Sequence, residues 1–445
     1  MKIQRVWAKK LHGTLTFDVN LSAGINLLVG INGSGKTSVL NIIHWITSLE
    51  LTTLATTEFD EIGLDILEPN KRKLSIKVTQ SDLDLYIHGT IGSTKLDPIH
   101  VNLSCLTKDL RNRKARKEEI IDHYRGLTPE KKEEKLWNIL KAIAKPLTIS
   151  LDRKITVSRD EVVYFTDETG SIRQKRTARA QVDPMVQVES IARQRHAQYQ
   201  SQLIRLNEIL KSKVISSTFS TRTGTSTSAG HGKDRVKPIT TSKIDAVEKK
   251  LLTRMSAWTA DPTEQASVKS YFDRIRAIIS NIQATTSKNI GAMLSNFLSD
   301  DMHRISALSD AFDEFELSAA AAYEPIQIYL KILNSFFADG NRKILFSEQD
   351  NQLYFQVNSD ATDLRNVDVM SSGERQVLIL LTYIAFSPQE SGIFVIDEPE
   401  LSLHPKWQHQ LLPSIDELMG ENTQMIIATH SPEIVGKYIE KCVEL

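Results

Sequence analysis

The chain has 445 residues, about three times the length of an ordinary domain, so we expect one large domain or two to three smaller ones. Lys and Arg total 55, as do Asp and Glu, and a formal net charge of zero excludes the global cationic surface of a protein that coats nucleic acid. A hydrophobic content of 40% and a charged content of 25% exclude an intrinsically disordered chain.

The sequence offers little that points to export or to a membrane. Cys105 and Cys442 are far apart and match no metal-ligand or disulfide spacing, which favours a reducing compartment. The longest apolar run, Val377 to Phe386, is about half the length that a membrane helix needs. No apolar secretory segment follows Met1. We therefore expect a cytoplasmic protein with no membrane partner.

The N-terminal part of the chain alternates between strand and helix patterns. Apolar residues at helical spacing predict a helix over residues 38–50, so Gly30 lies between a strand and a helix. Short runs of apolar and β-branched residues predict strands at residues 3–7, 15–19, 25–29, 73–78 and 84–91.

The middle of the chain is predominantly helical. Residues 108–141 are densely charged and predicted helical, with a helix start at Thr128 and Pro129, and a strand is predicted over residues 147–151. Ten of the thirteen residues from 216 to 228 are Ser or Thr, so we expect a flexible tip over residues 214–242, with helices from near Ser242 to about Ala338. Before the tip, spacings of four and three residues alternate in a short coiled-coil pattern formed by Ala192, His196, Tyr199, Leu203, Leu206 and Leu210.

The C-terminal part returns to alternating strands and helices. Strands are predicted at residues 343–346, 352–357, 392–396 and 424–428, with helices after Gly373 and around residues 404–419. Such alternation at both ends of the chain indicates one α/β domain assembled from two distant segments. We assign residues 1–95 and 341–445 to its two lobes, and residues 96–340 to a large α-helical, partly coiled-coil insertion.

A phosphate-binding loop is the clearest motif. Residues 30–37, Gly-Ile-Asn-Gly-Ser-Gly-Lys-Thr, match G-x-x-x-x-G-K-[ST] between a strand and a helix, which is the P-loop context. Its glycines let backbone N–H groups face phosphate oxygens, and the helix N-terminus favours anions. Lys36 would contact the β- and γ-phosphates of ATP, and Thr37 would bind Mg²⁺; the alternative is a glycine-rich turn with a chance lysine. The candidate nucleotide-binding residues are Gly30, Asn32, Gly33, Ser34, Gly35, Lys36, Thr37 and Ser38.

Two acids end the apolar run Ile393 to Ile396, which is typical of a strand buried on both faces. Adjacent carboxylates are costly to bury without a cation. In a P-loop enzyme Asp397 would hold Mg²⁺, directly or through water, and Glu398 would polarise the attacking water. The alternative is a pair of solvated acids at a strand end.

Residues 371–376, Ser-Ser-Gly-Glu-Arg-Gln, open the predicted helix that follows Gly373. Serine at a helix N-cap with exposed amide groups forms an anion site, although the segment read alone is only a well-capped helix. The position of Gly373, 24 residues before Asp397, favours phosphate binding. The candidates here are Ser371, Ser372, Gly373 and Glu374.

Together these motifs resemble the ABC-type ATPase superfamily, and within it the RecF, SMC and OLD-like branch rather than transporter subunits. The resemblance depends on the P-loop, on residues 371–376 in place of the ABC signature, and on Asp-Glu-Pro-Glu-Leu-Ser-Leu-His-Pro at residues 397–405. Ala-Thr-His-Ser-Pro at residues 428–432 completes it. The matches cover about the first 95 and the last 105 residues.

The resemblance implies two chains that dimerise head to tail around two ATP molecules. Ser372 and Gly373 of one chain would touch the γ-phosphate bound by Lys36 of the other. His430 would sense that phosphate, and the segment Glu400 to His404 would form a loop that couples the two sites.

The family also carries a glutamine loop linked to Mg²⁺, for which this sequence has no clean match. The best positional candidate is the predicted strand 147–151 followed by Asp152 and Arg153. Gln80 is a weaker candidate.

Two basic clusters lie in the predicted insertion. Residues 170–213 contain nine Lys or Arg and three acids, and such patches could contact nucleic acid phosphates. For the first cluster the alternative is a solvated helix face paired with neighbouring acids. The clusters consist of Arg111, Arg113, Lys114, Arg116 and Lys117, and of Arg173, Lys175, Arg176 and Arg179.

The leading hypothesis is a Mg²⁺-dependent ATPase that serves as sensor and scaffold in a prokaryotic anti-phage defence complex, similar to ATPase components of PARIS-type or Septu-type systems. Relatives of the OLD class continue into a Toprim nuclease domain, whereas this chain ends fifteen residues after His430. We therefore expect a homodimer or higher homo-oligomer with a separate effector, a nuclease of Toprim or HNH type or a toxin, and with a phage protein or double-stranded DNA as a further partner.

Two alternatives stay open. One is a RecF-like clamp of DNA repair or chromosome maintenance that binds double-stranded DNA through the basic insertion. The other is an ATP-gated scaffold in which nucleotide occupancy alone sets the assembly state. A transporter subunit is disfavoured because 361 residues separate Lys36 from Asp397, far more than in a compact transporter cassette.

Overall fold

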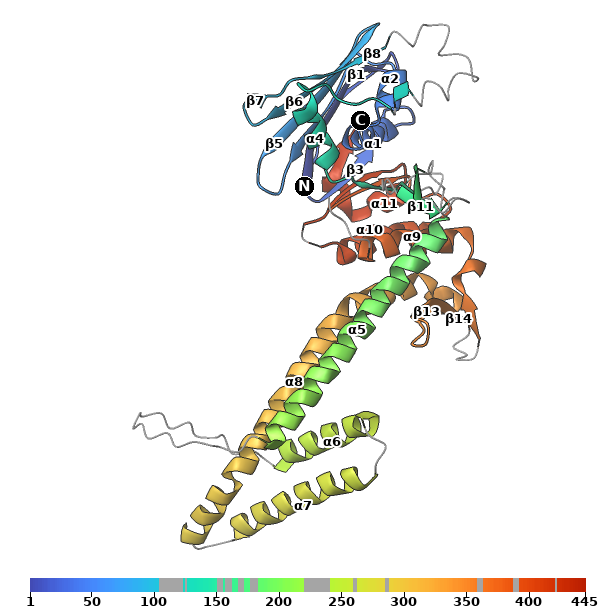
Figure 1. The fold of residues 1–445 in the computed structure, drawn as a ribbon. Coiled ribbons are helices and arrows are strands. Elements are labelled where there is room, and N and C mark those ends of the chain that lie inside the picture. The colour runs from blue at the N-terminus through green and yellow to red at the C-terminus, as the bar shows by residue number, and fades with distance from the viewer. Residues whose placement is uncertain are drawn as a thin grey trace. The chain divides into compact units, whose positions relative to one another are not determined.

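The computed structural model describes residues 1–103, 123–124, 126–149, 155–156, 162–166, 172–176, 183–219, 241–258, 262–284, 288–357, 363–386, 392–420 and 422–445. They form two compact units (Figure 1), one made of Met1–Arg195 and Ile328–Leu445 and the other of His196–Gln327. None of the helices in these ranges has the length and apolar character needed to cross a membrane.

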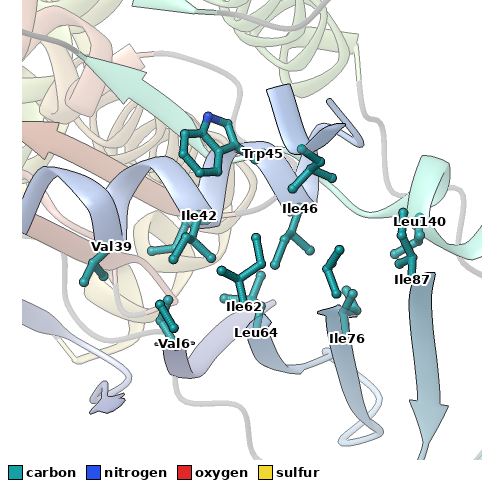
Figure 2. Packing of buried hydrophobic residues seen from close by; sticks show 14 of the residues in the cluster. Val6, Val39, Ile42, Trp45, Ile46, Ile62, Leu64, Ile76, Ile87 and Leu140 are labelled. Carbon is teal, nitrogen blue, oxygen red and sulfur yellow. The ribbon is translucent and has the colours of Figure 1, made fainter. Parts of the chain in front are cut away.

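The first unit contains an antiparallel sheet with strand order β2-β1-β4-β5-β6-β7, in which β8 also pairs with β6. Side chains alternate between its two faces, and the inward set packs under α1 (Lys36–Thr47), as Figure 2 shows for Ile62 and Leu64 beneath Ile42 and Ile46. The strands are β1 (Lys2–Leu11), β2 (Leu15–Asn20), β4 (Glu61–Leu67), β5 (Lys73–Gln80), β6 (Asp84–Ile91), β7 (Thr94–Lys95) and β8 (Ile99–Asn102). The helices α2 (Leu51–Thr56) and α4 (Glu134–Ala142) bury residues in the same core.

A second sheet has the order β10-β9-β16-β17-β3-β18 and is parallel except where β10 joins β9. Because the carboxyl ends of parallel strands meet at one edge of a sheet, the segments that follow β3, β16 and β17 converge there. Its strands are β3 (Ile25–Val29), β9 (Leu147–Ile149), β10 (Ile155–Thr156), β16 (Ile393–Asp397), β17 (Gln424–Ala428) and β18 (Cys442–Glu444).

Both faces of the parallel sheet are covered, which explains the uninterrupted apolar runs of β16 and β17. Val395 and Ile426 belong to the core that contains α1. Ile396 and Ile427 point the other way, into the core that contains α9 (Ser372–Phe386) and α10 (Pro405–Leu418). The P-loop helix α1 and the helix α9, which begins within residues 371–376, therefore pack on opposite faces of one sheet.

The first unit also contains several short elements. A small antiparallel sheet has the order β13-β14-β15, and a hairpin pairs β11 with β12. These elements are β11 (Val162–Thr166), β12 (Ile172–Arg176), the 3₁₀ turn η2 (Ala338–Gly340), β13 (Arg342–Phe346), β14 (Leu353–Val357), β15 (Leu364–Asn366), η3 (Val367–Val369), α11 (Pro432–Val435) and η4 (Gly436–Lys441).

The second unit is helical and has its own core. It is built from α6 (Thr241–Trp258), α7 (Pro262–Ala284) and parts of α5 (Pro184–Phe219) and α8 (Lys288–Phe337). Within this unit α5 and α8 run side by side, with the rings of Tyr199 and Tyr323 5.2 Å apart (Figure 1). Its buried residues include Leu210, Ile244, Val247, Phe272, Ile275, Ile305, Phe312 and Phe315.

The structure moves the predicted domain boundaries. The N-terminal lobe does not end at residue 95, because β8 adds to the antiparallel sheet and β9 adds to the parallel one. The predicted insertion 96–340 therefore contains strands of the first unit, and the separate helical unit spans only His196–Gln327.

The tip predicted at residues 214–242 also changes. Helix α5 continues to Phe219, and α6 begins at Thr241. In the extra turn of α5 the Ser216 hydroxyl donates to the Lys213 carbonyl, a bond that lets serine remain in a helix. The rest of the predicted tip, residues 220–240, lies outside the described residues.

Candidate functional site

The loop after β3 has a backbone that requires glycine. Gly35 has φ +106° and is the N-cap of α1 without a side-chain cap bond. A Cβ on Gly30 would lie 2.6 Å from the Leu445 carbonyl oxygen and 2.8 Å from Ser34 Oγ. The start of α1 therefore offers uncapped N–H groups beside a tightly packed loop, which is an anion-binding arrangement.

Lys36 lies against this loop. Its Nζ donates to the carbonyls of Gly30 (2.9 Å) and Ile31 (3.0 Å), and the residue is 5% exposed. Burial lowers the pKa of Lys36, while the charges of Asp397 and Glu398 act in the opposite sense. Ser34 Oγ is buried and has no hydrogen-bond partner within the described ranges. The Lys36 ammonium group, the unpaired Ser34 hydroxyl and the uncapped amide groups at the start of α1 together fit a bound phosphate.

The P-loop meets the acid pair across 360 residues of sequence. Thr37 Oγ1 donates to Asp397 Oδ1 over 3.3 Å. Burial raises the pKa of the Asp397 carboxyl, Glu398 adds to the rise, and the Thr37 bond and the Lys36 charge oppose it. A carboxylate that is buried beside another acid gains most from a nearby cation.

A hydroxyl and a carboxylate in contact are the hard oxygen donors that Mg²⁺ prefers, so Thr37 and Asp397 fit this ion. Within the described ranges no group of three or more His, Cys, Asp or Glu side chains could hold a metal by itself. Mg²⁺ commonly completes its ligand set with water and substrate phosphates, which suits a site beside a phosphate loop.

Glu398 and His430 face each other where β16 and β17 end. Glu398 Oε1 lies 3.5 Å from His430 Nε2, and both side chains are partly exposed. Glu398 has φ +46°, an uncommon value for a residue with a Cβ, and its N–H donates to the Ala428 carbonyl over 2.8 Å. Parallel pairing of Asp397 with Ala428 fixes this alignment of the two strand ends.

Residues 371–374 form a capped helix start. Ser371 N–H donates to Glu374 Oε2 over 2.7 Å, and Glu374 N–H donates to Ser371 Oγ over 3.4 Å. Arg342 pairs with the other carboxylate oxygen of Glu374. The contacts of Glu374 are therefore those of a helix cap and of an ion pair with the exposed Arg342, and the motif did not indicate the ion pair.

The same segment packs on the loop after β16. A Cβ on Gly373 would lie 2.6 Å from the Ser402 carbonyl oxygen, and Gln376 Nε2 donates to the Pro399 carbonyl over 2.9 Å. Within the described ranges no hydrogen bond or ion pair joins residues 371–374 to the P-loop of the same chain.

A cavity of about 180 Å³ lies beside the acid pair. Its lining includes Asp397 and Glu398, and is otherwise mainly apolar, with Ile149, Ile379, Leu380 and Ile396. The two carboxylates therefore border a small space between β9, β16 and α9.

A family model described as "AAA ATPase domain" matches residues 1–435, nearly the whole chain. The chain belongs to this family. The predicted fold class is confirmed: an α/β P-loop ATPase head of the ABC type with a large helical insertion.

Curated relatives match shorter segments. The chain is 36% identical over 76 residues to "Retron Ec83 probable ATPase" of Escherichia coli, covering 15% of this chain and 14% of that one. It is 33% identical over 111 residues to "DNA replication and repair protein RecF" of Klebsiella pneumoniae, covering 23% of this chain and 31% of RecF. The matched segments thus span less than a third of these relatives. The family model and RecF agree with the predicted RecF and SMC branch of ABC-type ATPases.

Solved SMC head domains match over nearly the whole chain, at low identity and with TM-scores below 0.5. An Smc head with an extended coiled coil from Pyrococcus furiosus has a TM-score of 0.41 and 12% identity, covering all of this chain and 93% of that one. The SMC head domain from Thermotoga maritima has a TM-score of 0.37 and 8% identity, covering 98% of this chain and 91% of that one.

The two glutamine-loop candidates lie in different sheets. β9 pairs in parallel with β16, next to the acid pair, and residues 150–154 that follow it lie outside the described residues. Gln80 lies on β5 of the other sheet, where its side chain accepts from Phe59 N–H and donates to the Ala55 carbonyl. Both ends of the Gln80 amide serve this packing, so Gln80 is the wrong candidate.

The predicted basic clusters are only partly described. Arg173, Lys175 and Arg176 lie on strand β12 rather than on a helix. Arg179 and the cluster of residues 111–117 lie outside the described residues.

Proposed function

We propose that the chain is a Mg²⁺-dependent ATPase in which water attacks the γ-phosphate in line. The observation that carries this proposal is the Thr37–Asp397 contact, which joins the P-loop to the acid pair. Lys36 and the amide groups at the start of α1 would bind the phosphates. Thr37 and Asp397 would hold Mg²⁺, which supplies charge neutralisation on the phosphate oxygens.

Glu398 would act on the attacking water. Its carboxylate would orient the water and accept its proton, and His430, 3.5 Å away, would contact both Glu398 and the γ-phosphate. Ser372 and Gly373 would complete the site of a second copy in a head-to-tail homodimer. Support comes from the motif at residues 371–376, which stands in place of the ABC signature.

Two substitutions test the ATPase proposal. Lys36→Ala removes the phosphate-binding ammonium group, and should abolish nucleotide binding in a titration with a fluorescent ATP analogue. Glu398→Gln should bind ATP, lower turnover by at least about 100-fold and accumulate a dimer in light scattering. Equal turnover by the wild type and Glu398→Gln would refute the role of Glu398.

For the cellular role, we propose a sensor and scaffold subunit of an anti-phage defence complex that controls a separate nuclease or toxin. The similarity to a retron ATPase favours this role. A nuclease or toxin encoded beside the gene should copurify with the chain and be released or activated on an ATP-state change. An isolated gene without such a neighbour would argue against it.

The similarity to RecF favours a second candidate, a DNA-binding ATPase of repair or chromosome maintenance. Double-stranded DNA should then stimulate hydrolysis with steep salt dependence, and alanine at Arg173, Lys175 and Arg176 should remove the stimulation. A matched control replaces the exposed Lys131, Lys132 and Lys135. If DNA neither binds nor stimulates the wild type, this candidate fails.

A further inference from the structure

The carboxylate of Glu400 collects three donors from the segment that carries His430. Its Oε1 accepts from the His430 N–H over 2.6 Å, from Thr429 Oγ1 over 2.9 Å and from the Ser431 N–H over 3.2 Å. These bonds join the turn after β16 to the turn after β17. The main chain of His430 is thereby held from the turn that also carries Glu398.

The surroundings make this connection rigid. Thr429 is 1% exposed, and Ser431 Oγ donates to Gln408 Oε1 over 2.6 Å. Gln408 in turn donates to the carbonyls of Leu403 (2.9 Å) and Glu400 (3.4 Å). Charge-assisted bonds are short and directional, so a shift of Glu400 would shift the main chain at residue 430.

The bonds of Glu400 are not explained by capping of α11. Ser431 is the N-cap of α11 and supplies the cap bond itself, from Ile434 N–H to Ser431 Oγ. Glu400 instead accepts from the two N–H groups on either side of the His430 Cα, those of His430 and Ser431, and neither of these is the cap bond. The His430 side chain is partly exposed, and its described contact is with Glu398. Its orientation therefore depends on where its backbone is held.

We propose that Glu400 is a positioning residue for the hydrolysis proposed above: its Oε1 fixes the main chain of His430 and so sets the distance between the imidazole and Glu398. This inference depends on that proposed function, because it assigns no chemistry to Glu400 itself. It also differs from the coupling role expected for residues 400–404, because it assigns Glu400 an effect on His430 of the same chain.

The test compares Glu400→Ala, Glu400→Gln and a matched control, Glu433→Ala, which removes an exposed carboxylate from the neighbouring helix α11. Glu400→Ala should lower kcat by about 10- to 100-fold, since an error of about 1 Å in a reacting group has this effect. KM for ATP should stay within about threefold, because the described carboxylate of Glu400 forms no hydrogen bond or ion pair with the P-loop and acts on Lys36 only through its charge. Glu400→Gln keeps one acceptor oxygen and should recover most of kcat, and Glu433→Ala should match the wild type.

A double-mutant cycle tests whether Glu400 acts through His430. In the His430→Ala background, Glu400→Ala should lower kcat by no more than about twofold further, because the group that it positions is already absent. Full additivity of the two losses would overturn the proposal. A rise in KM with unchanged kcat would also overturn it.

A second readout needs no turnover. The imidazole NMR signal of His430, identified by its loss in His430→Ala, should move in Glu400→Ala and keep its position in Glu433→Ala. If the wild type hydrolyses no ATP but the signal moves, the proposed ATPase function fails while the positioning contact stands. If the wild type is active and the signal does not move, the positioning role fails alone.

Discussion

Gly373→Ala tests whether the start of α9 must pack tightly on the loop after β16. The added methyl group would lie 2.6 Å from the Ser402 carbonyl oxygen, whereas ordinary contacts begin at 3.4 Å. The two segments must therefore separate by about 0.8 Å, an overpacking that costs about 1–3 kcal/mol. Alanine regains about 1 kcal/mol of helix propensity, so the net loss of stability is about 0–2 kcal/mol.

This loss is small for a folded chain, but the displacement is large for a segment that we propose touches the γ-phosphate. We expect Gly373→Ala to bind ATP like the wild type, because Lys36 and the P-loop are untouched. Turnover should fall by about 10- to 100-fold, since a displacement of nearly 1 Å at a reacting centre has such an effect.

The assay measures ATP affinity by titration, turnover by phosphate release, and ATP-dependent dimerisation by light scattering. Gly24→Ala is the matched control, because a Cβ there meets no atom within 4 Å. Wild-type turnover and dimerisation by a stably folded Gly373→Ala would show that the close approach to Ser402 is irrelevant to function.

Three further predictions concern contacts that hold the site in place. Gln424 is fully buried, and its side chain bonds both the N–H and the carbonyl of Ile3. Gln424→Leu leaves these groups unpaired and should lower the free energy of unfolding, measured in urea, by about 3–5 kcal/mol. The control, Gln349→Leu on the surface, should change it by under about 0.5 kcal/mol. Burial would raise the pKa of Glu374, but the bonds from Ser371 and the charge of Arg342 outweigh it and hold the pKa below the ordinary value of 4.5. The stability advantage of the wild type over Glu374→Gln should therefore be complete above about pH 4.5 and shrink as the pH falls below it; an advantage independent of pH would contradict this reasoning. Gly63→Ala would place a Cβ 2.0 Å from the Trp7 ring, so the ring must move. The free energy of unfolding, measured thermally, should fall by about 1–3 kcal/mol, and the tryptophan fluorescence should change. An unchanged fluorescence spectrum would refute the close packing of Trp7 on Gly63.

Much of the candidate site could be predicted because its motifs are local. The eight residues of the P-loop carry their own geometry, since Gly35 needs a positive φ and the loop lies between a strand and a helix. The apolar run before Asp397 likewise indicated a strand covered on both faces, as the two cores show. The loop residues and the acids were therefore identified from neighbours within a few positions of each other.

Other features depend on contacts with residues distant in the sequence, which no local pattern predicts. The motif made Glu374 a phosphate-binding candidate, but Arg342, 32 residues away, holds its carboxylate. Gln80 suggested a glutamine loop, yet its strand pairs in a different sheet. The boundary at residue 95 was wrong because β8 adds to β6 through backbone hydrogen bonds, which any sequence can form.

The sequence by itself determined the chemistry that is available: a phosphate loop, an acid pair, a capped helix start and a histidine after a strand. Only the tertiary structure decided which of these meet. Thr37 contacts Asp397, and Glu400 holds His430, because the order β16-β17-β3 brings three strand ends to one edge of the sheet. That order arises from backbone pairing and from packing on two faces, and both act over hundreds of residues.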